Sequence, residues 1–155
     1  MSQDPPAQDP LNQDEHFIAL QNMYLAAPVN QLYRPTIRVD EAEAEIQIDV
    51  QEQFFHSGGA VHGSIYFKML DDAAFFAANS LEREVFVLTT SFTTYLTRPV
   101  SSGSLRSVGR VVNRNRSQWI AEAVVYDSEE REIGRGNGIF VRSKHPLKNA
   151  LGYGS

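Results

Sequence analysis

The sequence predicts a single α+β domain in which an antiparallel sheet wraps around one long central helix. The first observation is the stretch 56–80, where a glycine-rich turn opens into a helix that is apolar on nearly every side, and such helices are buried. The second is the run of segments rich in threonine, valine and aromatic residues that follows this helix. These segments lie at roughly 85–97, 104–114, 118–127 and 132–142. One helix followed by a strand meander is typical of the α+β class.

Length and composition fit one ordinary globular domain. The chain has 155 residues, of which 42% are hydrophobic and 21% charged, which suffices for a single core. It has no cysteine, which excludes disulfides, thiolate metal ligands and a cysteine nucleophile. The N-terminus lacks the basic and apolar blocks of a signal peptide, and Lys68, Asp71 and Asp72 interrupt the longest apolar stretch. We therefore expect a cytoplasmic protein without a membrane span.

Three elements are predicted before the central helix. Apolar residues at helical spacing predict an amphipathic helix over 15–27, capped by Asp14 and followed by Pro28. We expect a first strand over 31–40. The second strand has a clearer signal, because alanine, isoleucine and valine alternate with acidic and amide residues over 41–50. This alternation indicates a half-buried strand with one wet face.

The two ends of the chain are predicted to lie outside the domain. Residues 1–14 are rich in proline, glutamine and aspartate, which predicts a disordered tail. The domain is expected over 15–143, and a loose tail over 144–155. A single curled sheet leaves one face and one edge uncovered, so we expect a homo-oligomer.

Charge is unevenly distributed along the chain. Residues 1–60 hold ten acids against two arginines, whereas residues 61–155 hold twelve bases against nine acids. No acid occurs between Val85 and Ala121, a stretch that includes Arg98, Arg106, Arg110, Arg114 and Arg116. These arginines form either a solvated sheet face or a positive field for a phosphorylated small molecule. The net charge of −5 and the lack of a recognition motif argue against nucleic acid.

Two adjacent acids, Asp71 and Asp72, lie in the middle of the apolar helix. A buried carboxylate without a partner is costly to keep charged, so each acid needs a partner or a chemical role. Successive helix residues point about 100° apart, so the two acids face different surroundings. Lys68 precedes Asp72 by four residues, which favours a structural ion pair there.

Three separate pieces of the sequence point to one family. The first is His62-Gly63, followed by Phe67, Asp71 nine positions after the histidine, Ala73, Ala77 and Asn79-Ser80. The others are Leu-Thr-Arg-Pro-Val at 96–100 followed by Ser-Gly, and Gly-Arg-Gly-Asn-Gly-Ile-Phe at 134–140. Over roughly 45–143, the chain resembles the hotdog-fold acyl-CoA thioesterases of the phenylacetate-degradation (PaaI) type.

The resemblance implies roles for two residues of the central helix. Asp71 would be the catalytic carboxylate, as general base or nucleophile, and would reach the site across a dimer interface. Gly63 would present its N–H at the helix N-terminus as an oxyanion donor. From the residues alone, Gly58, Gly59 and Gly63 could equally make only a tight turn, and Asp71 could be an ion-pair partner. Asp72 is the rival acid, to which we assign a structural role.

Other site residues follow from the same comparison. His56 stands where relatives often have an asparagine that orients the carbonyl or water, and Ser64 replaces the second glycine of His-Gly-Gly. Both are departures, and Ser64 could cap the helix or add a polar contact. The His62 ring is expected to hold the turn rather than to react, although it borders the substrate. Thr89 matches a position where some relatives use a serine to place water, but strand threonines are common for propensity alone.

The arginines and aromatic residues are less specific. Arg98, Arg114 and Arg116 are candidates to bind the nucleotide phosphates of coenzyme A. The aromatic residues are expected in the core, with one or two lining an acyl pocket; these are Phe75, Phe76, Phe92, Tyr95 and Trp119.

Several other sites find no support in the sequence. No Gly-x-Ser-x-Gly elbow occurs, which removes the serine-hydrolase hypothesis. The glycine run at 134–138 precedes a strand instead of opening a helix, the wrong context for a dinucleotide site. The gaps between His56, His62 and Asp71 fit no familiar metal-ligand spacing.

The resemblance therefore implies hydrolysis of an acyl-CoA thioester, which we expect to be carried out by a homodimer or dimer of dimers. No cofactor is expected beyond coenzyme A as part of the substrate, and the acyl group is either aryl or medium-chain aliphatic. Two alternatives stay open: a non-catalytic acyl-CoA or fatty-acid binding module, and a hydroxyacyl-thioester dehydratase using His56 or His62.

Overall fold

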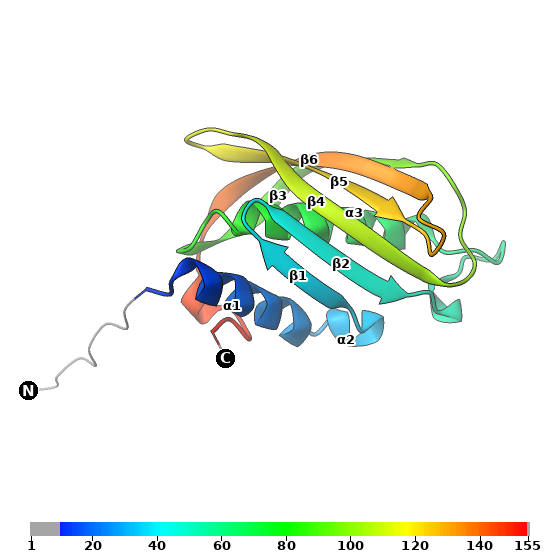
Figure 1. The fold of residues 1–155 in the computed structure, drawn as a ribbon, viewed down its shortest axis with the longest axis horizontal. Coiled ribbons are helices and arrows are strands. Elements are labelled where there is room, and N and C mark those ends of the chain that lie inside the picture. The colour runs from blue at the N-terminus through cyan, green and yellow to red at the C-terminus, as the bar shows by residue number, and fades with distance from the viewer. Residues whose placement is uncertain (1–9, 155) are drawn as a thin grey trace, which may run out of the picture.

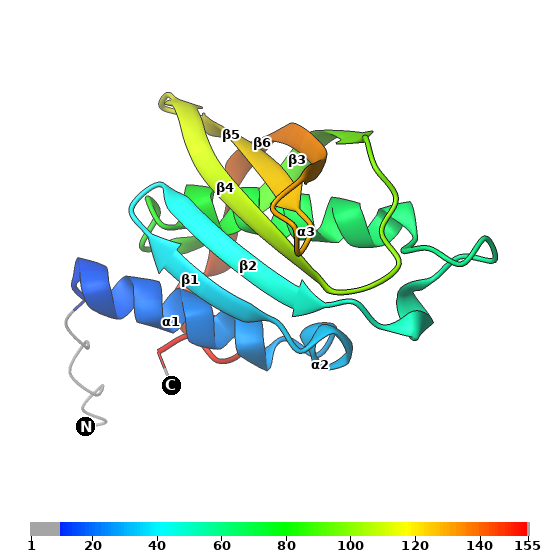
Figure 2. The same cartoon turned by 45° about the vertical axis from the view of Figure 1, so that its right-hand side comes forward.

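One long helix packs against a six-stranded antiparallel sheet in the computed structural model, which describes residues 10–154 (Figure 1). The helix is α3 (Gly63–Asn79), and the sheet order is β1-β2-β4-β5-β6-β3. The sheet curves over α3, as Figure 2 shows, which confirms the predicted α+β architecture. The strands are β1 (Thr36–Asp40), β2 (Glu43–Asp49), β3 (Val85–Leu96), β4 (Ser104–Arg114), β5 (Gln118–Tyr126) and β6 (Glu132–Pro146).

The helix backbone lies directly against the middle of the sheet. Met69, Leu70 and Ala73 on α3 are fully buried. Gly109 on β4 permits this close approach, because a Cβ atom there would lie 2.3 Å from the Ala73 carbonyl oxygen. The Ser107 hydroxyl, also on β4, donates to the Met69 carbonyl at 2.7 Å. A helix held this tightly fixes the direction of every side chain on its remaining faces.

The two edges of the sheet differ. The β1 edge is covered by α1 (Gln13–Ala26), whose Gln21 Oε1 accepts the Val39 N–H at 2.9 Å. Strand β3 forms the other edge and pairs with β6 on its inner side only. It exposes Leu88, Tyr95 and Leu96, each about half accessible. An open edge of twelve residues with apolar side chains is a surface that proteins normally pair or cover.

The N-terminal elements differ in detail from the prediction. Helix α1 (Gln13–Ala26) begins earlier than expected, and its N-cap is Asn12, whose Oδ1 accepts the Glu15 N–H at 2.9 Å. The assignment of Asp14 as the cap is therefore wrong. The predicted strand over 31–40 is wrong in its first half, because residues 30–33 form the short helix α2 (Asn30–Tyr33). The Asn30 amide holds this turn on α1 by donating to the Tyr24 carbonyl at 2.7 Å.

The C-terminal segment is packed on the domain, contrary to the expected loose tail over 144–155. Strand β6 continues to Pro146 and leads into the 3-10 helix η2 (Leu147–Asn149), where Leu147 is buried. The Tyr153 hydroxyl lies 2.8 Å from Nδ1 of the buried His16 on α1. The predicted tail over 1–14 falls mostly outside the described residues, and its last two residues belong to α1. Within residues 10–154, no helix is long and apolar enough to cross a membrane.

Candidate active site

A short loop, ordered by backbone hydrogen bonds, positions the N-terminus of α3. Phe55 and Val61 form an isolated antiparallel bridge, and the His62 N–H donates to the Phe54 carbonyl at 2.8 Å. The Val61 N–H donates to the carbonyl of Val100, beyond the end of β3, at 2.9 Å. These bonds close the glycine-rich turn and fix where the helix begins.

The His62 side chain is the N-cap of α3. Its Nδ1 accepts the Ser64 N–H at 3.0 Å and lies 2.8 Å from the Ser64 hydroxyl. His62 thus satisfies one of the free amides of the first turn, in agreement with the expectation that its ring holds the turn. Ser64 adds a polar contact and is not itself the cap.

His56 lies on the same exposed turn. Its Nδ1 accepts the Gly58 N–H at 2.9 Å, and its ring centroid is 6.5 Å from that of His62. Because Nδ1 accepts a hydrogen in both rings, each neutral ring carries its proton on Nε2. Neither ring forms an ion pair with an acid within residues 10–154.

Gly63 is the first residue of α3 and lies beneath the side chain of Leu96. A Cβ atom on Gly63 would lie 2.7 Å from Leu96 Cδ1. The Gly63 N–H precedes the first i→i−4 bond of the helix, and it has no acceptor among the described residues. The site therefore offers one free donor at the positive end of a helix.

Asp71 lies two turns into α3, partly buried against the edge strand. Thr89 on β3 donates its hydroxyl to Asp71 Oδ1 at 2.8 Å. Burial is the largest effect on the pKa of Asp71, which is raised to about 6. The hydrogen bond from Thr89 and the charge of Lys68 act to lower this pKa, whereas the charge of Asp72 raises it further. Desolvation is thus the dominant cause, and the carboxyl group can change its protonation state near neutral pH.

Aromatic pairs flank Asp71 on both sides, an arrangement that the sequence analysis missed. Phe67, one turn before the acid, meets Phe92 of β3 edge-on at 5.6 Å between ring centroids. Phe75, one turn after it, meets Phe86 of β3 at 5.0 Å. The i, i+4 spacing of Phe67, Asp71 and Phe75 is a sequence signal that could have predicted one shared face.

Asp72 belongs to a different network. Lys68 Nζ lies 2.7 Å from Asp72 Oδ2, which confirms the predicted ion pair. The Tyr24 hydroxyl of α1 donates to the same oxygen at 2.7 Å. Burial and the Asp72 charge raise the pKa of Tyr24, so it stays a neutral donor at neutral pH. These contacts tie α1 to α3 and give Asp72 a structural role.

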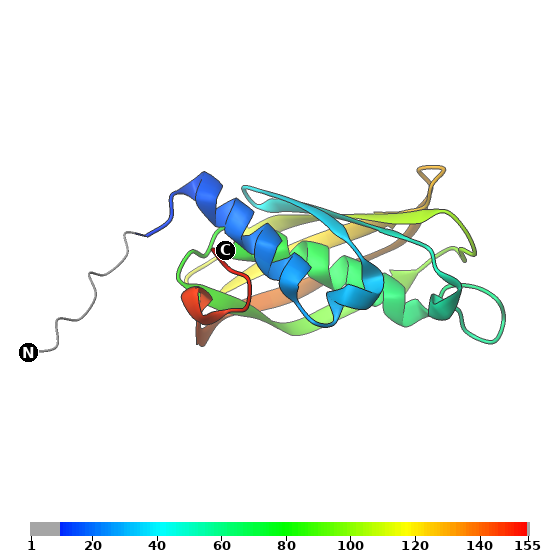
Figure 3. The same cartoon turned by 90° about the horizontal axis from the view of Figure 1, so that it is seen from below.

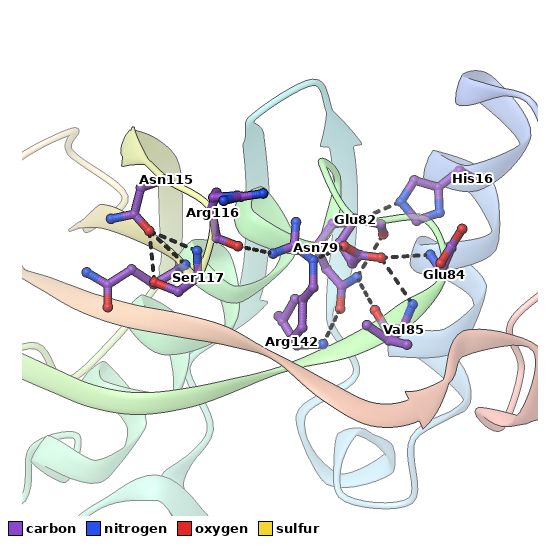
Figure 4. Close-up of polar contacts among 11 residues, drawn as sticks. His16, Asn79, Glu82, Glu84, Val85, Asn115, Arg116, Ser117 and Arg142 are labelled. Carbon is purple, nitrogen blue, oxygen red and sulfur yellow. Dashed lines mark hydrogen bonds and ion pairs between the residues drawn. The ribbon is translucent and has the colours of Figure 1, made fainter.

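The candidate phosphate-binding arginines do not form one cluster within a chain. The Arg98 carbonyl accepts the hydroxyl of Tyr66, near the start of α3. The Arg116 carbonyl instead accepts from Arg142 at 3.0 Å, and Arg142 binds Glu82 beyond the end of α3 (Figure 4). Helix α3 has 17 residues and is about 25 Å long, so these two arginines lie at opposite ends of the site.

The arginines also differ in whether a carboxylate already pairs with them. Arg106 pairs with Glu45 at 3.1 Å and with Glu130, and Arg110 lies 3.7 Å from Glu43. In contrast, the side chains of Arg98, Arg114 and Arg116 are exposed and form no ion pair within the described part of the chain.

The predicted aromatic core is confirmed in part. Phe76 and Trp119 are buried, whereas Phe75 and Phe92 are half-buried beside Asp71 and Tyr95 is exposed. No group of three or more potential metal ligands occurs among residues 10–154.

Comparisons with known proteins agree with this architecture. The family model of the thioesterase superfamily matches residues 58–133, which include the glycine turn, α3 and β3. A "putative esterase" of Mycobacterium tuberculosis is 29% identical over 97 residues, covering 60% of this chain and 69% of the relative. A "putative esterase" of Sulfurisphaera tokodaii is 22% identical over 104 residues, covering 66% and 77%.

Solved structures show the same fold. The PaaI protein of Escherichia coli, from the phenylacetic acid degradation operon, superimposes with a TM-score of 0.78 at 17% identity, covering 86% of this chain and 97% of its own. The thioesterase HI1161 of Haemophilus influenzae gives a TM-score of 0.70 at 16% identity, covering 77% and 85%. In its sequence motif, its fold and the family model that matches residues 58–133, this chain is similar to the thioesterase superfamily.

Proposed function

We propose that the protein hydrolyses acyl-CoA thioesters, releasing coenzyme A and a carboxylic acid, with Asp71 as general base. The observation that carries this is the partly buried Asp71 carboxyl group, held by Thr89 and with a pKa raised to about 6. A base with a pKa near the working pH is both ionised and able to take a proton in the transition state. The match to the thioesterase superfamily model supports a thioester as the bond that is cleaved.

In the proposed reaction, Asp71 removes a proton from a water molecule as the water oxygen attacks the thioester carbonyl carbon. The carbonyl oxygen becomes an oxyanion, which the Gly63 N–H binds at the helix N-terminus. The C–S bond then breaks, and the proton passes from Asp71 to the leaving thiolate. His56 orients the substrate or the water through its free Nε2, and Thr89 fixes the carboxylate.

Gly63 and Asp71 of one chain are separated by eight residues of helix, about 12 Å along its axis. This distance is too long for both to act on one carbonyl group. We therefore place the two residues of each site on different chains of a homodimer. The open β3 edge supports this arrangement, because antiparallel pairing of two β3 strands would bring α3 of one chain beside the start of α3 of the other.

Release of thiol from a panel of acyl-CoA thioesters tests the proposal. The wild type should turn over at least one of them, and Asp71→Asn should lower kcat/KM by about 100-fold or more, since it removes the base. Asp72→Asn should stay within a few-fold of the wild type. No turnover of any thioester by the wild type, or a loss on Asp72→Asn alone, would refute the proposal.

Proline substitution tests the oxyanion donor at Gly63. Proline is accepted at the first position of a helix and has no N–H. His62 already has the extended backbone (ψ 142°) that a following proline requires. Gly63→Pro should lower kcat by about 100-fold with the fold intact. Gly63→Ala keeps the N–H and is the matched control for added bulk against Leu96.

A further inference from the structure

An apolar groove with a volume of about 670 Å³ lies beside the candidate active site and shares only Phe86 with the residues described there. Met23 of α1 and Ala27, directly after that helix, form one wall, and Phe86 and Leu88 of β3 form another. Ala150 and Leu151 of the C-terminal segment form the third. Figure 3 shows that this segment lies beside α1, where Gly152 fits closely against Ala26.

The groove begins one helical turn from Asp71. Its wall residue Phe86 contacts Phe75, which follows Asp71 by four residues on α3. Its other β3 residue, Leu88, immediately precedes Thr89, the hydrogen-bond partner of Asp71. An acyl chain whose thioester carbonyl is at Asp71 can therefore enter the groove past Phe75.

The composition and size of the groove favour a flexible aliphatic chain. Seven of its ten lining residues are apolar, and the flexible Met23 side chain can adapt to a chain that lacks a fixed shape. A cavity of about 150 Å³ suffices for benzene, so this groove is several times larger than an aryl group needs. Its two basic residues, Lys144 and His145, are exposed, so their polar ends reach water, and no acid among residues 10–154 lines the groove.

We propose that this groove binds the acyl chain, and that the substrates are linear aliphatic acyl-CoA thioesters of medium or long chain rather than aryl thioesters. This inference rests on the proposed thioesterase function. The family model matches residues 58–133. Among the residues that line the groove, only Phe86 and Leu88 lie within this range. Chain-length selection is thus assigned to α1 and the C-terminal segment.

Binding of hydrolysis-resistant alkyl-CoA thioethers, measured by titration calorimetry, tests the groove without requiring turnover. Ethyl, hexyl and dodecyl thioethers are compared on the wild type, Ala27→Trp and Ala150→Trp, which fill the groove from different elements. The control is Val112→Trp, at an exposed position on β4 that does not line the groove. Size-exclusion mass and circular dichroism check that each variant keeps its assembly and fold.

The wild type and Val112→Trp should bind more tightly by about fourfold for each added methylene, as expected for burial of apolar surface. Both groove variants should lose most of the dodecyl advantage while binding the ethyl ligand normally. Equal affinities along the series in the wild type, or an unchanged chain-length dependence in both groove variants, would overturn the proposal.

Thiol release from the matching thioesters separates this proposal from the proposed function. Chain-length-dependent binding without any turnover would refute the hydrolase function and leave the groove assignment standing. Turnover that is independent of chain length, in the wild type and the groove variants alike, would refute the groove and leave the hydrolase function standing.

Discussion

At the scale of single residues, the partly buried environment of Asp71 disfavours the charged form of its carboxyl group. Its pKa of about 6 in the folded chain lies above the ordinary value of 3.8. A raised acid pKa means that the folded state binds more protons, so it is penalised at high pH and relieved as the pH falls through 6. Catalytic groups are often kept in such unfavourable surroundings.

Asp71→Asn should therefore stabilise the protein at pH 7.5, by about 1–2 kcal/mol after allowance for solvent screening of a partly exposed group. The gain should shrink between pH 6 and pH 4, where the wild-type carboxyl becomes protonated in the folded state while it is still ionised in the unfolded state. Chemical denaturation at several pH values measures it. Asp72→Asn should instead destabilise at pH 7.5, because it leaves the half-buried Lys68 without its partner; stabilisation by both variants would contradict this account.

Thr89 should tune the acid limb of the pH–rate profile. Its hydrogen bond lowers the pKa of Asp71, so Thr89→Val should move the acid limb of kcat/KM to higher pH and lower the rate below pH 7. Thr89→Ser should restore the profile, because it returns the hydroxyl. Thr90→Val, at an exposed neighbour whose hydroxyl donates to the Ile139 carbonyl, is the matched control. An unchanged acid limb in Thr89→Val would show that this hydroxyl does not act on Asp71.

The contacts of site residues that could be predicted from the sequence are those between residues close together along the chain. The Lys68–Asp72 pair follows from i, i+4 spacing, and the His62 cap from its place before the helix. The covering of Gly63 by Leu96 depends on how β3 packs across α3. No pattern within either segment encodes that crossing, so the contact could not be predicted.

At the scale of secondary-structure elements, the crossing of α3 over β4 is set by Gly109. A methyl group there would meet backbone atoms of Ala73 and Ala74 at 2.3–2.5 Å, and backbone cannot move aside as a flexible side chain can. Gly109→Ala should cost about 3 kcal/mol or more through overpacking, measured as a lower midpoint of denaturation. Val112→Ala on the same strand is exposed and should cost much less. Equal small losses would place the helix farther from the sheet.

A buried histidine joins three segments at one end of the molecule. His16 Nε2 lies 2.9 Å from the Asn79 carbonyl at the end of α3, while Nδ1 meets Tyr153 (Figure 4 shows the first contact). Burial is the largest effect on the pKa of His16 and lowers it, and the charge of Arg83 lowers it further. The hydrogen bond with the Asn79 carbonyl and the charge of Glu82 oppose this shift, but the pKa remains lowered. The neutral ring is therefore favoured in the folded state.

The folded state should lose stability as the pH falls below 6.5, because only the unfolded state then binds a proton at His16. This sign is opposite to that of Asp71. The difference between the Tm–pH curves of wild type and His16→Gln isolates the histidine, and the wild type should fall more steeply between pH 6.5 and 5. Parallel curves would mean that the ring is protonated in place.

The strands were predicted better than the chain ends for a physical reason. The polar–apolar alternation of β2 reports directly on which face is buried, and Ala44, Ile46 and Ile48 are indeed in the core. The C-terminal segment has no such period. Its packing depends on single residues, Leu147 and Tyr153, that meet distant parts of the chain.

At the scale of the whole molecule, the described domain has one covered edge and one open edge. The contact between α1 and β1 closes the first through Gln21 and Val39, whereas β3 stays available along its outer side. The helix length separates the two proposed site residues by about 12 Å within a chain. Both observations point to a site that is completed by a second copy.

Complementation between two inactive variants tests this central claim. Asp71→Asn lacks the base and Gly63→Pro lacks the donor, so each homodimer should be inactive. After unfolding and refolding an equal mixture, half of the dimers are hybrids, and each hybrid holds one intact site made from the unmodified Asp71 and Gly63. Thiol release should then recover to about a quarter of the wild-type rate. No recovery, with hybrid dimers confirmed by mass, would contradict a site shared between chains.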